Sequence, residues 1–256
     1  MWRYIKFAFL FPAGVLLGWL IYQFLAFPNI GNLRDQNPET TALIETRIKE
    51  AAARGEQPRK VQSWVPLEKI SPNLIRAVLA GEDTNFATHH GFDYEAIQRA
   101  WDEAQREAEK EAKTEGETDQ SSWRWPSFDF KRGASTITQQ LAKNLYLTTE
   151  KSFVRKAKEA VITYFLERKL TKRRILEIYL NVIEWGDGIY GAEAASQYYF
   201  HKPAAALNLR EGAFLSAIIP NPRKDFNPQL NPRRVARRQR IIMRGMSYVK
   251  LPDGIG

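Results

Sequence analysis

The sequence has no cysteine and very little histidine, and this limits the chemistry that the chain can perform. Of its 256 residues, none is cysteine and three are histidine. The chain therefore forms no disulfide, a property that fits an oxidising compartment without proving one. His89 and His90 are neighbours whose side chains diverge on any regular backbone, and only His201 remains to join them. We therefore expect no histidine metal site.

The sequence also lacks internal repeats, and its length leaves no room for a second large domain. Hydrophobic residues make up 44% of the composition, enough to bury one good core. Apolar residues recur mostly at helical spacing. We therefore expect a single, mainly α-helical domain.

One long uncharged run stands near the start of the chain. Residues 7–27 contain no charged side chain, and only Gln23 is strongly polar. About 20 such residues cross a bilayer as a helix. A cleaved signal peptide is the alternative, but the run is long and offers a poor small-residue cleavage site. Because Arg3 and Lys6 precede the run, we expect a retained anchor whose amino terminus faces the cytoplasm.

The positive charge of the chain is concentrated in two segments. Residues 103–120 hold seven acids and three bases, a local −4, which leaves +13 for the rest of a chain of net charge +9. Much of the excess lies in residues 151–174 and 223–250. With an anchor present, anionic lipid is a better partner than nucleic acid. The second segment includes Arg233, Arg234, Arg237, Arg238, Arg240 and Arg244.

The run GASTITQQLAKNLYL at residues 133–147 combines a glycine, hydroxyls, amides and a lysine. Ser135 or Thr136 can cap the helix that the leucine spacing predicts. A capped amphipathic helix with a solvated face is one interpretation. The other is a binding edge formed by the polar side chains Thr138, Gln139, Gln140, Lys143 and Asn144.

The upstream run EDTNFATHHGFDYEAI at residues 82–97 follows an apolar helical stripe that ends at Gly81. Glu82 and Asp83 therefore stand where a buried helix ends. Partial burial raises a carboxyl pKa toward neutrality, as a general acid or base requires. An exposed turn is the alternative.

A third polar cluster, SFVRKAKEA at residues 152–160, places Arg155, Lys156 and Lys158 beside Glu159. Thr171 is a plausible cap between the two helices predicted here. Cations at a helix start make a good anion site, and they keep a neighbouring carboxylate ionised. Ion-paired surface helices explain the same pattern.

The segments EDTNFATHHG, GASTITQQLAKN, RKAKE, RRILEIYLN and EWGDGIYGAEAASQYYF occur in this order. Their succession resembles the five motifs of the peptidoglycan glycosyltransferases, lysozyme-like enzymes that polymerise lipid II. Without a second domain, the chain resembles the monofunctional branch of the family rather than half of a class A penicillin-binding protein. The resemblance implies β-1,4-linked glycan strands made with inversion, and release of undecaprenyl pyrophosphate.

The resemblance also implies roles for individual residues. Glu82 would be the general base, Asp83 its support and Glu159 a second catalytic carboxylate. Lys151 stands where family members often carry arginine, and lysine lacks the bidentate fork. The substrate-binding set would be Ser135, Thr136, Gln139, Gln140, Lys143, Lys151, Arg155, Lys156 and Lys158.

Cofactors and partners follow from the same resemblance. No cofactor is required by the residues, although a divalent cation, Mg²⁺ or Mn²⁺, at the donor pyrophosphate is an option. The partners would be lipid II, the growing glycan, the membrane and other cell wall synthesis or division proteins, with no nucleic acid. The location would be the bacterial inner membrane, single-pass, with the catalytic domain in the periplasm.

We expect a cytoplasmic tip and anchor at residues 1–28, a linker at 29–60, a lysozyme-like glycosyltransferase domain at 61–246 and a tail at 247–256. Within the domain, residues 102–128 form a mobile insertion that starts as a solvated helix or a disordered stretch. It would be a lid, a membrane contact, a docking arm or an inert insertion. A lysozyme-like hydrolase and a non-catalytic membrane scaffold are the other function classes; neither accounts for all five motifs.

Overall fold

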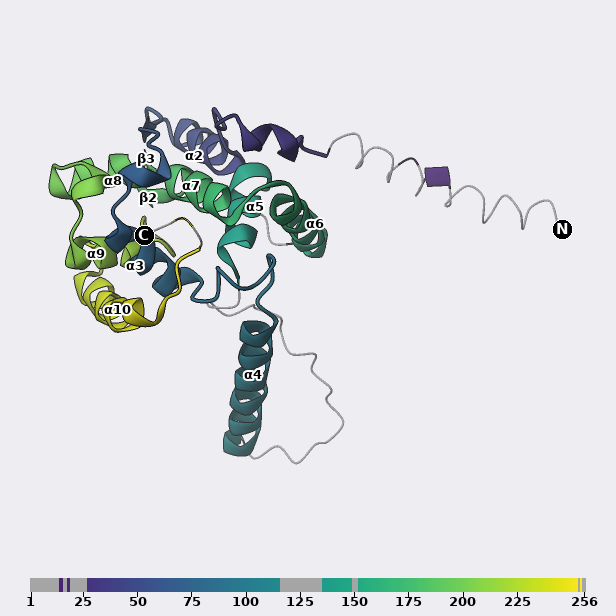
Figure 1. Cartoon of the computed structure of the whole chain (residues 1–256). Coiled ribbons are helices and arrows are strands. Elements are labelled where there is room, and N and C mark those ends of the chain that lie inside the picture. The colour runs from purple at the N-terminus through teal and green to yellow at the C-terminus, as the bar shows by residue number, and fades with distance from the viewer. Residues whose placement is uncertain are drawn as a thin grey trace.

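The computed structural model describes residues 27–115, 135–148, 152–252 and 254, with residues 14, 15 and 18. The architecture is mainly helical, as expected (Figure 1). Within this described part, no helix is long and apolar enough to span a membrane. The predicted anchor lies almost entirely outside the described residues, and so does the predicted site residue Lys151.

Nine α-helices make up most of the described chain. They are α2 (Ala42–Ala53), α3 (Pro72–Glu82), α4 (Tyr94–Glu115), α5 (Ile137–Tyr146), α6 (Phe153–Lys169), α7 (Lys172–Val182), α8 (Ala192–Phe200), α9 (Leu209–Ile218) and α10 (Pro232–Gly245). Short 3-10 helices are η1 (Ile30–Arg34), η2 (Leu67–Lys69), η3 (Ala204–Ala206) and η4 (Met246–Tyr248).

A small sheet accompanies the helices. Its strands are β1 (Val61–Gln62), β2 (Glu184–Gly186) and β3 (Ile189–Tyr190), in the order β1-β3-β2. β1 runs parallel to β3 with Val61 opposite Ile189, and β2 runs antiparallel to β3 with a register shift between Glu184 and Gly186. The sheet thereby fastens the segment before α3 to the hairpin after α7.

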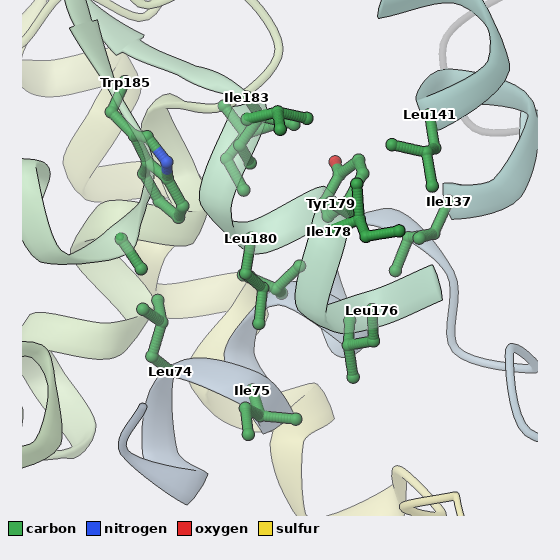
Figure 2. Close-up of a cluster of buried hydrophobic side chains, with 14 of the residues drawn as sticks. Leu74, Ile75, Ile137, Leu141, Leu176, Ile178, Tyr179, Leu180, Ile183 and Trp185 are labelled. Carbon is green, nitrogen blue, oxygen red and sulfur yellow. The ribbon is translucent and has the colours of Figure 1, made fainter. Parts of the chain in front are cut away.

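The core lies between α3, α5, α7 and α9. Figure 2 shows buried side chains from three of these helices in one cluster, among them Leu74 of α3, Leu141 of α5 and Leu180 of α7. α3 also packs on α9 and α10, and α5 packs on α6. The two polar motifs at the end of α3 and along α5 are thus attached to one rigid core.

The segment expected to be a linker packs against the domain. It contains η1 and α2, and α2 lies on α5. Ile44 is completely buried, and Arg47 pairs with Glu184 of β2 at 3.0 Å. The apolar face of α2 therefore belongs to the core rather than to a separate tether.

The acidic insertion begins as part of a long helix. α4 starts at Tyr94 and continues to Glu115, and Figure 1 shows it projecting away from the helical body. Of the two expected states, a helix or a disordered stretch, residues 102–115 adopt the helix, which fits a sequence rich in helix-forming residues. Residues 116–128 of the predicted insertion lie outside the described residues.

Candidate active site

The first site carboxylate, Glu82, is the last residue of α3. Ser71 caps this helix by accepting from Asn73 N, and Pro72 occupies its first turn. At the other end, a Cβ on Gly81 would lie 2.6 Å from the Ser216 Oγ and 3.1 Å from Ile242. Glycine is therefore required for the end of α3 to approach α9 and α10 this closely.

Glu82 is held by side chains from two other helices. Arg238 of α10 donates from Nη2 to Glu82 Oε1 at 2.7 Å, and Gln140 of α5 donates from Nε2 to Oε2 at 2.9 Å. Only 9% of the Glu82 side chain is exposed. Burial raises the pKa of Glu82 above its ordinary value, while Arg238, Gln140 and Lys143 oppose that rise. A partly desolvated carboxylate with an adjacent cation is what a general base near neutral pH requires.

A buried tyrosine fixes the orientation of Gln140. The Tyr179 hydroxyl on α7 donates to Gln140 Oε1 at 2.8 Å, which leaves the amide nitrogen of Gln140 to face Glu82. Burial raises the pKa of Tyr179 well above its ordinary value, and the nearby charges of Glu82 and Asp83 add to the rise. Tyr179 therefore stays protonated and remains a donor. The hydrogen bonds from Tyr179 to Gln140 and from Gln140 to Glu82 are thus both donated toward Glu82.

Asp83 connects the end of α3 to the start of α5. Its side chain is 2% exposed, and its Oδ2 accepts from Ile137 N at 2.9 Å. Its Oδ1 lies 2.9 Å from His89 Nε2. His89 Nδ1 accepts the Gly91 N–H at 3.1 Å, so this nitrogen carries no proton and Nε2 donates to Asp83. Asp83 thus supports Glu82 by fixing two segments beside it.

The start of α5 is built by a capping box. Thr136 Oγ1 accepts from Gln139 N at 3.2 Å, and Gln139 Oε1 accepts from Thr136 N at 3.0 Å. Thr136 also donates to Gly91 O at 2.7 Å. Gly91 has φ +93, and a Cβ there would lie 2.9 Å from Thr163. Predicted as substrate ligands, Thr136 and Gln139 here shape the helix start, whereas Ser135 is partly exposed.

The second predicted carboxylate, Glu159 on α6, is buried among cations. Arg155 Nη1 lies 2.7 Å from Glu159 Oε2, and Lys156 Nζ pairs with Glu159 Oε1. Arg155 Nε is buried without a hydrogen-bond partner in the described part of the chain. Lys158 is exposed and forms no ion pair with any described residue. The helix therefore presents a compact cationic group around one carboxylate. This arrangement is consistent with an anion site and with ion pairing within the helix, the two interpretations of the sequence.

Lys143 of α5 interacts electrostatically with both Glu159 and Glu82. The surrounding protein lowers the pKa of Lys143, the charges of Arg155 and Lys156 lower it further, and the two carboxylates oppose the change. Because the side chain reaches solvent, water limits this lowering. Lys143 therefore lies within electrostatic range of both Glu82 and the cationic group on α6.

Two hollows adjoin these residues. A small cavity of about 160 Å³ includes Glu82, Asp83, Arg99, Ser135 and Thr136 in its lining. A larger open hollow of about 1070 Å³ is lined by residues of the 85–93 loop, the start of α4 and the end of α6. Glu82 and Ser135 therefore border a space that a substrate group can enter.

Three residues of this site were not assigned to it from the sequence. Arg238 was noticed only as part of the basic carboxyl-terminal segment, Tyr179 only as part of the motif RRILEIYLN, and His89 only as an unsuitable metal ligand. The paired geometry of Arg238 and Glu82 has no local signal, since 156 positions separate the two residues. A glutamate at a buried helix end does signal the need for a cationic partner.

Comparison with known proteins identifies the family of the chain. The Transglycosylase family model matches residues 48–117 and 120–247. A biosynthetic peptidoglycan transglycosylase of Chromobacterium violaceum is 40% identical over 240 residues, which cover 94% of this chain and 96% of the relative. Relatives of the same name are 39% identical in Azoarcus sp. strain BH72, covering 98% of both chains, and 42% identical in Thiobacillus denitrificans, covering 91% of both. The chain belongs to the transglycosylase family.

Proposed function

We propose that this protein is a peptidoglycan glycosyltransferase that polymerises lipid II into glycan strands for the bacterial cell wall. The observation that carries the proposal is the position of Glu82, buried between Arg238 and Gln140 and in electrostatic contact with Lys143. The names of the relatives, biosynthetic peptidoglycan transglycosylases, support the same reaction class.

In this reaction a sugar hydroxyl of one substrate attacks the anomeric carbon of another. The new bond joins that oxygen to the carbon, the bond from the carbon to the pyrophosphate breaks, and the hydroxyl proton passes to Glu82. Burial raises the pKa of Glu82, and Arg238 opposes that rise and so favours the ionised form that accepts the proton. Attack from the side opposite the leaving group inverts the carbon and gives the β-1,4 linkage.

The cationic side of the site suits the departing undecaprenyl pyrophosphate. Lys143 and Arg155 place positive charge beside Glu159, and Lys158 is exposed on the same helix as Arg155. Negative charge on the pyrophosphate grows as the bond breaks, so cations placed in advance stabilise the transition state more than the ground state. Glu159 acts by holding Arg155 and Lys156 in position.

The residues do not offer a ready site for a divalent cation. Both oxygens of Glu159 already accept from cationic side chains. Among the described residues, no group of three or more histidine or carboxylate side chains could hold a metal ion. An EDTA titration of polymerisation tests whether the substrate pyrophosphate brings Mg²⁺ or Mn²⁺ with it.

The function is tested by incubating the purified full-length protein with lipid II and separating the products on a gel. We expect a ladder of glycan strands in wild type and almost none in Glu82→Gln. Consumption of lipid II to short cleaved products would indicate a hydrolase, and no consumption would refute the proposal.

We also propose that the protein is a single-pass inner-membrane protein with its catalytic domain in the periplasm. Phe27, at the end of the apolar run, packs on Phe165 of α6 with ring centroids 5.2 Å apart. Deleting residues 1–28 should release a folded domain from membranes. That domain should polymerise lipid II in detergent and work more slowly on bilayers, because the anchor concentrates the enzyme with its substrate. A truncation that stays membrane-bound would contradict the anchor.

A further inference from the structure

The outer face of α10 carries a row of arginines, the arginine stripe, consisting of Arg233, Arg237, Arg240 and Arg244. All four side chains are exposed. Their spacing of four, three and four residues places them on one face of the helix. Within the described part of the chain, none of them forms an ion pair. The stripe extends for about 16 Å at the helical rise of about 1.5 Å per residue.

The opposite face of α10 is committed to the core and to the active site. Val235, Ile242 and Met246 are buried, with α10 packed on α3 and α9. From this same face Arg238 reaches Glu82. The stripe therefore lies one helix diameter, about 10–12 Å, from the side of α10 that holds the catalytic base.

Exposed apolar and aromatic side chains accompany the arginine stripe, which a surface that serves only solubility would not need. Ile241 is next to Arg240 in α10, and Tyr248, in η4, follows Arg244; they are 60% and 83% exposed. An unpaired cationic row with apolar and aromatic side chains suits a ligand that has both anionic and apolar groups. The length of the row indicates an extended ligand rather than a single small anion.

We infer that the arginine stripe binds the growing glycan strand through the carboxylates of its peptide side chains. This inference rests on the proposed function, since the strand is the extended anionic product made next to α10. A peptide-bearing glycan presents carboxylates repeatedly along its length, which matches a row of guanidinium groups.

The position of the stripe argues against a lipid surface as its ligand. The end of the predicted anchor, Phe27, packs on α6. Figure 1 shows α6 and α10 on opposite sides of the body. The membrane surface that the predicted anchor enters is thus nearer to α6 than to α10. The outer face of α10 is therefore accessible to the glycan product.

The test measures binding of the full-length protein in detergent to purified peptide-bearing glycan strands. The stripe variant is Arg237→Gln/Arg240→Gln/Arg244→Gln. Its matched control is Lys49→Gln/Lys60→Gln/Lys69→Gln, which removes three exposed cations that lie elsewhere. We expect the stripe variant to bind at least about tenfold more weakly, and the control to change by less than about threefold. Unchanged melting temperatures exclude misfolding.

Two further arms identify the ligand. With β-1,4-linked N-acetylglucosamine oligomers, which are uncharged and carry no carboxylate, the stripe variant and wild type should bind alike. Vesicles of phosphatidylglycerol and phosphatidylethanolamine should bind both proteins equally. Equal binding of peptide-bearing strands by both variants, or a loss confined to vesicles, overturns the inference. Because preformed strands are supplied, a protein that fails to polymerise lipid II still reports on the stripe, and wild-type lipid II consumption tests the proposed function separately.

Discussion

Replacing Arg238 with alanine should move the pH dependence of the enzyme. Arg238 donates to Glu82 Oε1 at 2.7 Å, and the Glu82 side chain is only 9% exposed. A hydrogen bond to a charged group contributes about 1.5–3 kcal/mol. At about 1.4 kcal/mol per factor of ten, losing it should favour the protonated form of Glu82 by about tenfold to a hundredfold, so the pKa of Glu82 rises beyond the rise that burial already causes.

The sign of the expected change follows from the role of Glu82. A general base works in its ionised form, so activity falls as the pH drops through its pKa. The acidic limb of kcat/KM should therefore move to higher pH in Arg238→Ala. Activity should be lost most at low pH and largely recover at alkaline pH. Arg238→Lys, which keeps the charge, should shift the limb less.

The assay is the initial rate of lipid II consumption across the pH range, with Arg76→Ala as the control. Arg76 is an exposed arginine on α3 and forms no ion pair with any described residue. Arg238 also donates to Gly81 O at 2.8 Å, so each variant needs a melting curve to show that α3 stays in place. An equal loss of rate at every pH, with an unmoved acidic limb, would refute the reasoning.

Three further changes test the rest of the site. Glu82→Gln should reduce polymerisation by at least about a hundredfold, because a general base contributes roughly that much. Its melting temperature should not fall at neutral pH. Because folding raises the pKa of Glu82, the ionised carboxylate lowers the stability of the folded state as the pH rises through that pKa. Glutamine removes this cost. Lys143→Ala should lower turnover by about a hundredfold even at saturating lipid II and leave the melting temperature unchanged. Gly81→Ala should destabilise the fold by about 1–3 kcal/mol, because its Cβ would lie 2.6 Å from the Ser216 Oγ.

Each of these three predictions has an outcome that would contradict it. More than about a tenth of wild-type turnover in Glu82→Gln would remove that residue from the role of base. For Lys143, the matched control is Lys169→Ala at the far end of α6, and equal turnover in the two variants would place the donor pyrophosphate elsewhere. For Gly81, a wild-type melting temperature would show that α3 does not need this close approach.

The local features of the site could be predicted from the sequence because their signals are close along the chain. The helix over Ile137–Tyr146 was indicated by its leucine spacing, and the choice between two caps was resolved as Thr136. Thr171 caps α7 as expected, accepting from Arg174 N. The cluster around Glu159 was visible because Arg155 and Lys156 stand one helical turn before it. Caps and i to i+4 pairs are set by helix geometry alone.

The surroundings of Glu82 were decided only by tertiary packing. The sequence indicated a carboxylate at the end of a buried helix, but Gln140 and Arg238 are 58 and 156 positions away. Neither contact follows from a periodicity, because each depends on how α5 and α10 pack against α3. The close approach at Gly81 makes that packing possible. A pKa is set by burial and nearby charge, so the chemistry of this carboxylate exists only once the three helices have assembled.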